Sequence, residues 1–105
     1  MMIDTNAPEL SQNCHDFNLT KQTELIQQIK DWFRQVPDTM YEIIIVKHRF
    51  TGAVNIFTLK ERYQMRSQSK SLLRIPGENV NEKQIDYFAK QLRQEVPELV
   101  ISKEF

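Results

Sequence analysis

The sequence predicts one α+β domain in which two helices pack on one face of a small, mainly antiparallel sheet of three to four strands. Apolar residues recur every three or four positions in two separate segments, and β-branched residues cluster between these segments. A proline ends each helical pattern, and a chain of 105 residues is too short to build two separate cores. The predicted order is helix, strand, strand, an optional third strand, helix and strand.

Residues 1–18 show no sustained period of either 2 or 3.6 residues. They mix Asp, Asn, Ser and Gln with a proline, which is typical of a chain terminus without its own core. The sequence therefore predicts a flexible N-terminal tail over 1–18 and a single folded domain over 19–105.

The first predicted helix covers residues 21–35. Thr20 is its predicted N-cap, because a threonine hydroxyl can accept a hydrogen bond from a free backbone N–H of the first turn. Pro37 ends the helix, since the residue before a proline is disfavoured in helical geometry. The apolar face of this helix consists of Leu25, Ile26, Ile29, Trp32, Phe33 and Val36.

Two strands follow as a hairpin. The first covers residues 40–50 and contains Tyr-Glu-Ile-Ile-Ile-Val, whose β-branched side chains favour a pleated surface. Thr51 and Gly52 predict a two-residue turn, because glycine adopts the positive φ that a tight hairpin needs. The second strand covers residues 53–63.

A polar segment then separates this hairpin from the second helix. Residues 64–71 have nothing apolar to bury except one methionine, and they predict a flexible loop. Residues 71–75 form the optional third strand, and Pro76 and Gly77 form a turn.

The second predicted helix begins after Asn81, which is its N-cap, with Gln84 at the third helical position. Pro97 ends this helix, and residues 98–104 form the last predicted strand. The apolar face consists of Ile85, Phe88, Ala89, Leu92 and Val96.

Two similar four-residue segments lie at the ends of the two predicted helices. Gln-Val-Pro-Asp at 35–38 and Glu-Val-Pro-Glu at 95–98 each end a helix and precede a strand. Proline is a common helix terminator, which explains this similarity without any relation between the two halves. Two related halves would instead give an arrangement similar to a ferredoxin-like sandwich, with its first strand taken from the tail.

The composition excludes several classes of function. Fourteen basic and fourteen acidic residues give no net charge, so no field of the whole chain attracts nucleic acid or an anionic membrane. The single cysteine, Cys14, rules out an internal disulfide framework and fits a reducing, cytoplasmic location. No apolar run approaches the roughly 18 residues that cross a bilayer, and the N-terminus lacks the pattern of a signal peptide. We therefore expect no membrane partner.

The residues that carry chemistry in enzymes are sparse. Gly52 and Gly77 are too far apart to form a phosphate-binding loop, and neither His15 nor His48 has a second ligand at helical spacing. Cys14 precedes His15, but nothing in a tail would orient this pair, so we expect an ordinary exposed thiol. We predict no enzyme activity, no metal and no cofactor, unless a pocket brings a carboxylate to His48.

Charge is distributed unevenly along the chain. The formal charge is −4 over residues 1–46, +6 over residues 47–74 and −2 over residues 75–105. The neutral whole therefore contains a basic middle. We predict that this middle binds nucleic acid or an acidic protein surface through Lys47, Arg49, Lys60, Arg62, Arg66, Lys70 and Arg74.

The predicted two-residue turn also assigns faces to the hairpin. It places Ile44, Val46, His48, Phe50, Ala53, Asn55, Phe57, Leu59 and Tyr63 on the face that covers the helices. It places Lys47, Arg49, Lys60, Arg62 and Arg66 together on the opposite, exposed face. A three-residue loop would instead split the basic residues between the two faces. Lysine and arginine on an exposed sheet also discourage edge pairing, which is the purely structural explanation for them.

The leading functional hypothesis is a small non-enzymatic binding module that contacts nucleic-acid phosphates through this basic hairpin and the loop after it. The alternative is a small protein–protein adaptor or inhibitor, for example of a nucleic-acid-processing machine such as mobile elements encode, acting by shape and charge. Two of Phe50, Phe57 and Tyr63 are expected in the core, and only one or two of these residues could serve in base stacking. Tyr87 lies off its helical stripe, either half-buried or as an anchor for a partner. An open edge on the last strand would allow a homodimer.

Overall fold

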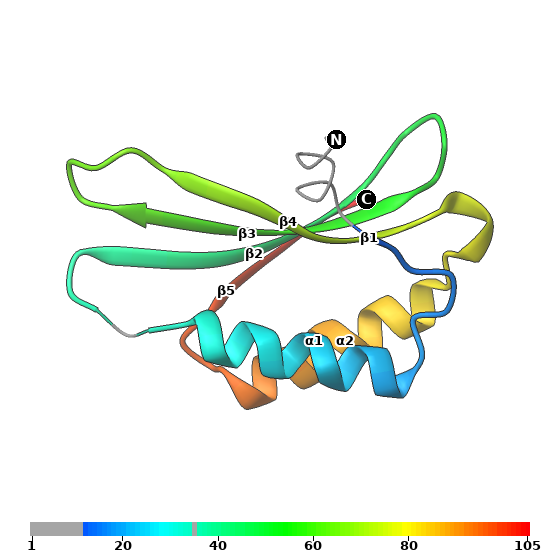
Figure 1. The fold of residues 1–105 in the computed structure, drawn as a ribbon, viewed down its shortest axis with the longest axis horizontal. Helices are drawn as coiled ribbons and strands as arrows, with labels where there is room; N and C mark the ends of the chain where they lie inside the picture. Colours follow the sequence, from blue (N-terminus) through cyan, green and yellow to red (C-terminus); the bar gives the residue numbers. More distant parts are fainter. Residues whose placement is uncertain (1–11, 35) are drawn as a thin grey trace, which may run out of the picture.

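The computed structural model describes residues 12–34 and 36–105, which form two layers (Figure 1). One layer is a five-stranded sheet, and the other consists of two helices on the same side of that sheet. The helices are α1 (Leu19–Trp32) and α2 (Glu82–Glu95), and a short 3-10 helix, η2 (Gly77–Asn79), precedes α2. The strands are β1 (Gln12–Asn13), β2 (Thr39–Lys47), β3 (Val54–Arg62), β4 (Gln68–Ile75) and β5 (Val100–Glu104).

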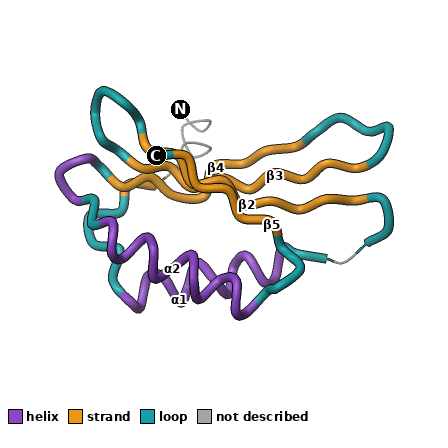
Figure 2. The backbone as a smooth tube through the Cα atoms, turned by 180° about the vertical axis from the view of Figure 1, so that it is seen from behind, coloured by secondary structure: helices purple, strands orange, loops and turns teal. Residues whose placement is uncertain are grey.

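The sheet has the strand order β1-β4-β3-β2-β5 (Figure 2). Strand β3 is antiparallel to both of its neighbours, whereas β1 is parallel to β4 and β5 is parallel to β2. The predicted α+β class is confirmed, and the optional third strand is β4. This strand begins at Gln68, so the predicted loop over 64–71 is wrong in its second half. Hydrogen bonding to β3, rather than burial of side chains, places these polar residues in the sheet.

Residues 12–18 belong to the folded domain, although their polar, aperiodic sequence predicts a flexible tail. Strand β1 pairs with β4, and the side chains of Cys14 and Phe17 are only 4% and 1% exposed. The Phe17 ring packs edge-on against Phe88, with 5.2 Å between the ring centroids. The expectation of an exposed Cys14 thiol is therefore wrong. Residues 1–11 of the predicted tail lie outside the described residues.

An asparagine caps each of the two helices. Asn81 is confirmed as the N-cap of α2, because its side chain accepts a hydrogen bond of 3.0 Å from the backbone N–H of Lys83. The predicted N-cap of the first helix, Thr20, is wrong. Helix α1 begins earlier, and the side chain of Asn18 accepts from the backbone N–H of Lys21 at 2.9 Å. Asparagine is at least as good a cap as threonine, and burial of the adjacent Phe17 fixes the start of the helix there.

The loop between β2 and β3 is longer than predicted. Lys47 lies opposite Val54, so six residues connect the strands and the predicted two-residue turn is wrong. The backbone N–H of His48 donates to the carbonyl of Ala53 at 2.7 Å, and the N–H of Gly52 donates to the carbonyl of His48 at 2.9 Å. The His48 ring nitrogen Nδ1 also accepts two backbone N–H groups within the loop, at 3.2 Å each. This side chain therefore stabilises a wide turn where a tight one was expected.

The face of the hairpin that packs on the helices is opposite to the predicted one. The buried face contains Tyr41, Ile43, Ile45, Val54, Ile56 and Thr58. The side chains predicted to cover the helices are half-buried on the open face, and the helices do not cover them; they are Ile44, Val46, Phe57 and Leu59. The pairing of even residues in β2 with odd residues in β3 is correct, and only the choice of face is wrong.

Strand β4 explains this choice. Leu73 and Ile75 lie opposite Ile56 and Val54, so they extend the buried face. The other side of β4 contributes Ser69 and Arg74, together with Ser71, and these polar residues continue the open face. Both faces of the hairpin are apolar by themselves. The helices therefore cover the face that stays apolar across three strands.

The two similar segments at the helix ends lie in two similar strand–helix–strand units. Strands β1 and β2 are connected through α1, and strands β4 and β5 are connected through α2. Within each pair the strands run in the same direction, and the second unit is displaced by one strand position across the sheet. A strand does come from the predicted tail. The ferredoxin-like arrangement is nevertheless wrong, because three strands rather than two separate the helices.

Replacement of Phe17 tests whether the segment before α1 is part of the core. Phe17→Ala should lower the free energy of unfolding by about 3–5 kcal/mol, because it leaves a cavity against Phe88. His15→Ala, at an exposed position of the same segment, should change it by less than about 0.5 kcal/mol. Urea unfolding followed by circular dichroism measures both. Equal stability of the two variants would contradict this packing.

The contact between the β2–β3 loop and η2 gives a second prediction. A Cβ atom on Gly77 would lie 2.1 Å from the backbone oxygen of Thr51, so Gly77→Ala should destabilise the protein by about 2–3 kcal/mol. Gly52 has φ of +75°, and a Cβ there would lie 3.8 Å from the Cα of Gly77, an ordinary contact, so Gly52→Ala should cost about 1 kcal/mol through its backbone conformation alone. Thermal unfolding of the two variants should rank them in this order, and the reverse order would contradict the close approach.

Candidate nucleic-acid interface

The structure divides the predicted basic residues among three places. Lys60, Arg62, Arg66 and Lys70 lie on β3, β4 and the turn between them. Lys47 and Arg49 lie at the end of β2 and in the loop that follows it. Arg74 lies on the open face of the sheet, where it donates a hydrogen bond to Asn13 at 3.3 Å. The seven residues therefore do not form one continuous surface.

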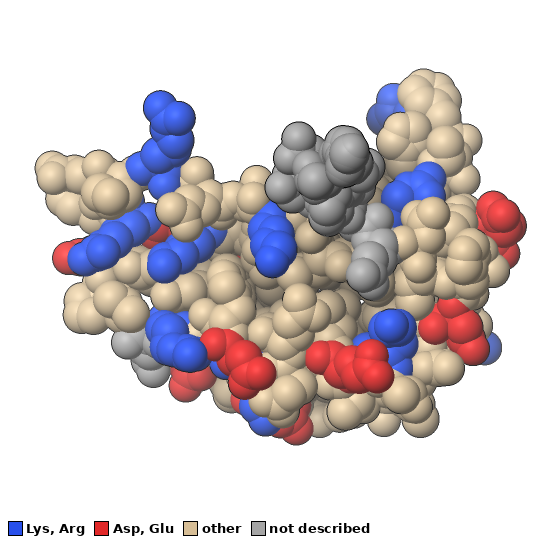
Figure 3. All heavy atoms as spheres, in the orientation of Figure 1, with Lys and Arg blue, Asp and Glu red and all other residues tan. Residues whose placement is uncertain are grey.

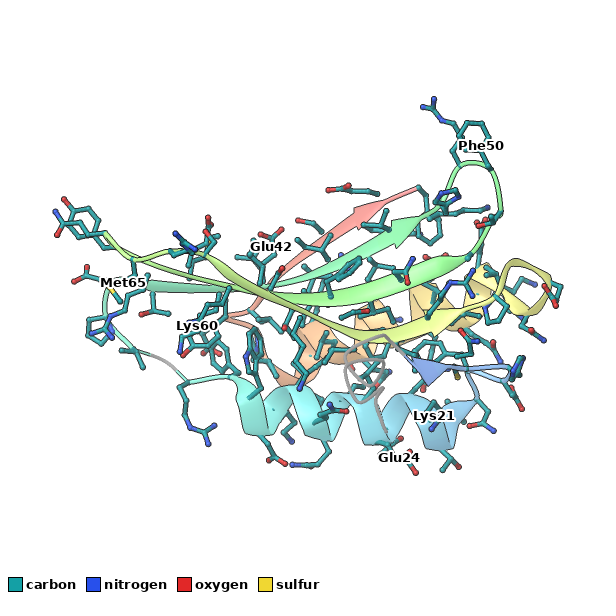
Figure 4. The ribbon with its side chains drawn as sticks, turned by 45° about the horizontal axis from the view of Figure 1, so that its top comes forward. Lys21, Glu24, Glu42, Phe50, Lys60 and Met65 are labelled. Carbon is teal, nitrogen blue, oxygen red and sulfur yellow. The ribbon has the colours of Figure 1, made fainter. Side chains whose placement is uncertain are left out.

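The two larger groups lie at opposite ends of the sheet. Strand β3 runs from the β2–β3 loop to the β3–β4 turn, and its nine residues span about 27 Å at 3.4 Å per residue. Figure 4 shows this separation, with Phe50 of the β2–β3 loop at one end and Met65 of the β3–β4 turn at the other. Lys60 lies toward the Met65 end in the same view. A single ligand contact cannot use both groups unless the ligand follows the length of the sheet.

We define the hairpin cluster as Lys60, Arg62, Arg66 and Lys70. Residues 60 and 62 of β3 alternate onto the same side as the buried Thr58, and Lys70 lies directly opposite Thr58. These three side chains therefore belong to the helix side of the sheet, whereas Arg66 lies in the turn. The hairpin extends past the end of α1, so no helix covers its tip (Figure 1). Figure 3 shows Lys and Arg side chains gathered at this end of the molecule.

The hairpin cluster is not neutralised by ion pairs. Within the described part of the chain, the cations that form ion pairs are Lys21, Lys30, Lys47 and Lys103. The carboxylate nearest in sequence, Glu61, alternates onto the other face of β3 and accepts a hydrogen bond from Ser67 at 2.9 Å. Four positive charges thus share one short hairpin. Their mutual repulsion makes an anion favourable there.

Aromatic residues at the base of the hairpin hold Lys60 in place. Its Nζ lies 5.7 Å from the centre of the Tyr41 ring, which is the geometry of a cation–π contact. Trp32 and Phe33 pack edge-on against the same tyrosine, with centroids at 4.9 and 5.1 Å. This contact joins the cluster to the C-terminal end of α1. The base of the hairpin is therefore supported while its tip is exposed.

The tip of the hairpin exposes two large side chains, Tyr63 and Met65. The sequence predicted Tyr63 on the face that covers the helices and gave no role to Met65. Tyr63 is 71% exposed and Met65 is 65% exposed. Phe50 is also exposed and Phe57 is half-buried on the open face, so the expectation that two of these three aromatics are in the core is wrong. Tyr63 follows the last residue of β3, and its position beside the turn is the signal that could have identified it.

The remaining predicted residues have local partners. Lys47 forms an ion pair with Glu82 at the start of α2, with 2.9 Å between Nζ and Oε2. Arg49 is exposed in the loop beside Phe50. His48 and Glu104 both line a shallow hollow at this end, but no hydrogen bond joins them in the described structure. The Nδ1 of His48 is instead occupied by the loop backbone, which leaves no oriented acid–base pair.

The chain matches no family model, no curated protein and no solved structure. Among residues 12–34 and 36–105, no three His, Cys, Asp or Glu side chains come together as metal ligands. No helix in these ranges is long and apolar enough to cross a membrane. The geometry and charge of the β3–β4 hairpin are therefore the features of the molecule that indicate a function.

Arg62 and Arg66 form no ion pair within the described part of the chain, which predicts how reversal of their charge affects stability. Arg62→Glu combined with Arg66→Glu should change the free energy of unfolding by no more than about 0.5 kcal/mol, because both side chains are exposed and lose no ion pair. Lys47→Glu should cost up to about 1 kcal/mol, since it replaces an ion pair with two adjacent carboxylates. Chemical denaturation measures both effects. A strongly destabilised double variant would show that the hairpin cluster is structural.

Proposed function

We propose that this protein is a small non-enzymatic module that binds the phosphate backbone of nucleic acid through the β3–β4 hairpin. The observation that supports this most strongly is the hairpin cluster, four cations on one projecting hairpin that form no ion pair with any of residues 12–34 and 36–105. Each cation that neutralises a phosphate releases a condensed counterion, which favours binding. The proposed binding site therefore consists of four of the seven basic residues that the sequence predicts.

The exposed side chain of Tyr63 favours single strands over duplexes. Its ring is available beside Arg62 at the hairpin tip, and base–aromatic stacking contributes about 1–3 kcal/mol per base. A duplex keeps its bases stacked and unavailable to such a ring. Arginine is among the side chains that most often read base edges; α1 contains no arginine and α2 only Arg93, so little sequence selectivity is expected.

Salt dependence provides a quantitative prediction. Four phosphate contacts give a slope of about −2.8 for log K against log salt concentration on single strands. Raising the salt from about 50 to about 200 mM should therefore weaken binding roughly fiftyfold. Fluorescence anisotropy of labelled single-stranded DNA and RNA measures this, with duplexes of the same length as comparison. A salt-independent affinity would contradict the proposed mechanism.

Two charge-matched variants locate the site. Arg62→Glu with Arg66→Glu should weaken binding by more than about tenfold and reduce the salt slope, because two phosphate contacts are lost. Lys47→Glu with Arg49→Glu makes the same change in net charge at the opposite end of the sheet, and should weaken binding much less. Tyr63→Phe should retain single-strand affinity, whereas Tyr63→Ala should reduce it. Equal losses in both charge-reversal variants would indicate attraction by overall charge rather than by the hairpin.

A protein-interaction role is the second candidate, and the open face of the sheet favours it. Ile44, Val46, Phe57 and Leu59 lie together at the centre of this face, and none of the described helices covers them. Exposed apolar patches often mark interaction surfaces. An adaptor or inhibitor could use this face for contact and the hairpin cluster for attraction to an acidic partner. No binding to any oligonucleotide at about 50 mM salt would exclude the first candidate and favour this one.

A further inference from the structure

The outer surface of the helix layer contains a groove between α1 and α2. Its volume is about 390 Å³, and its apolar lining comes from Leu19, Ile26 and Tyr87. Leu19 is 62% exposed and Tyr87 is 47% exposed, which is unusual for large side chains on helices that also cover a core. The residues that line the groove all belong to α1 and α2. The β3–β4 hairpin, which carries the hairpin cluster, extends past the end of α1 (Figure 1).

A buried hydrogen-bond acceptor in the wall of this groove is left without a donor. Gln22 is 4% exposed, and its Nε2 donates to the backbone oxygen of Phe17 at 2.8 Å, which fixes the orientation of the amide. Its Oε1 accepts no hydrogen bond within the described part of the chain. Buried polar atoms without a partner are costly and uncommon. Gln22 lines the groove, so a donor seated there reaches this buried oxygen once a neighbouring side chain moves aside.

The two ends of the groove differ in charge, because a lysine without an ion-pair partner among the described residues lies at one end and an ion pair lies at the other. Helices α1 and α2 run in the same direction, and their C-terminal ends are joined by the Lys30–Glu95 ion pair at 3.0 Å. At the N-terminal ends, Lys83 lines the adjoining hollow together with Asn18, Leu19, Gln22 and Tyr87. Lys83 has no ion-pair partner among the described residues. The aligned helix dipoles add partial positive charge at this end and partial negative charge at the other.

We propose that the occupant of this groove is the same surface of a second copy of the chain, related by a two-fold axis perpendicular to the helices. Such an axis reverses the helix direction, so the positive end of one groove meets the negative end of the other. Lys83 and Glu95 lie at equal distances on either side of Ala89, so Lys83 of each copy meets Glu95 of the other. Lys30 contacts Oε1 of Glu95, which leaves Oε2 for Lys83 of the other copy, so two intermolecular ion pairs result.

The same axis supplies the missing donor. Tyr87 and Gln91 also lie symmetrically about Ala89, and Gln22 is at the level of Tyr87 because both line the two hollows. The side-chain amide of Gln91 therefore approaches Gln22 of the second copy, and its N–H can donate to Oε1. Ile26 and Tyr87 of the two copies pack beside this contact. Both of the unusual features of the groove, its exposed apolar residues and its unpaired acceptor, are then explained by one partner.

The size of this surface sets the expected affinity. Each helix has 14 residues and is about 21 Å long, so the two-helix layer covers about 400 Å² in projection. Stable interfaces bury about 800 Å² per partner when measured as accessible surface, roughly a tenth of a small protein. The total accessible surface here is 7079 Å². The interface is therefore of the smaller kind, and we expect a dissociation constant in the micromolar range.

Sedimentation velocity over about 5 to 500 µM protein tests the proposal, because a micromolar dimer changes its sedimentation coefficient across this range. Tyr87→Glu and Gln91→Glu should each raise the dissociation constant at least tenfold, the second because it places a carboxylate against Oε1 of Gln22. Tyr63→Glu makes the same tyrosine replacement at the exposed hairpin tip and should leave the dimer unchanged. Circular dichroism establishes that each variant is folded.

A charge exchange distinguishes this interface from other modes of association. Lys83→Glu should weaken the dimer. Lys83→Glu combined with Glu95→Lys and Lys30→Glu should restore it, because the intermolecular pairs and the Lys30–Glu95 pair all re-form in the opposite sense. A monomer throughout the concentration range would overturn the proposal. So would a dimer that survives Tyr87→Glu and Gln91→Glu but is lost with Ser102→Pro, since this result would indicate pairing of the exposed edge of β5. Neither outcome bears on nucleic-acid binding by the hairpin cluster.

Discussion

Burial of one face of the β2–β3 pair under the helices determines where every other surface of the molecule lies. Ile43, Ile45, Val54 and Ile56 are completely buried there, and each contributes about 1.5–3 kcal/mol relative to an exposed position. Because side chains alternate along a strand, this burial directs the residues between them to the open face. The same alternation sends Lys60 and Arg62 to the helix side. Lys60 is half-buried there and Arg62 is exposed, because the hairpin continues past α1.

Much of this arrangement follows from the sequence, and the exceptions have physical reasons. The helices, the hairpin and the cap at Asn81 follow from local patterns, since propensity and capping depend on near neighbours. The buried face of the hairpin does not, because residues 43–46 are apolar on both sides of the strand. Which face is buried depends on Leu73 and Ile75 of β4, and thus on pairing between β3 and β4.

The segment before α1 shows the same limitation on a smaller scale. Phe17 is a single large apolar residue among polar neighbours, so periodicity gives no reason to place it in the core. Its burial against Phe88 is a tertiary contact between residues that are 71 positions apart in the sequence. The sequence identified the basic residues of the candidate site but not their arrangement in space. The seven basic residues are in the basic middle of the chain, yet only four of them share one hairpin, because β3 separates its two ends by about 27 Å.

A chemical-shift titration of isotopically labelled protein with single-stranded oligonucleotide tests the central claim most directly, because it reports on each backbone amide separately. The account predicts saturable changes at residues 60–70, in the β3–β4 hairpin, and little change at residues 47–52, at the opposite end of the sheet. The changes should disappear as salt is raised, since they depend on phosphate contacts. Changes centred on residues 47–52, or none at any residue, would contradict it.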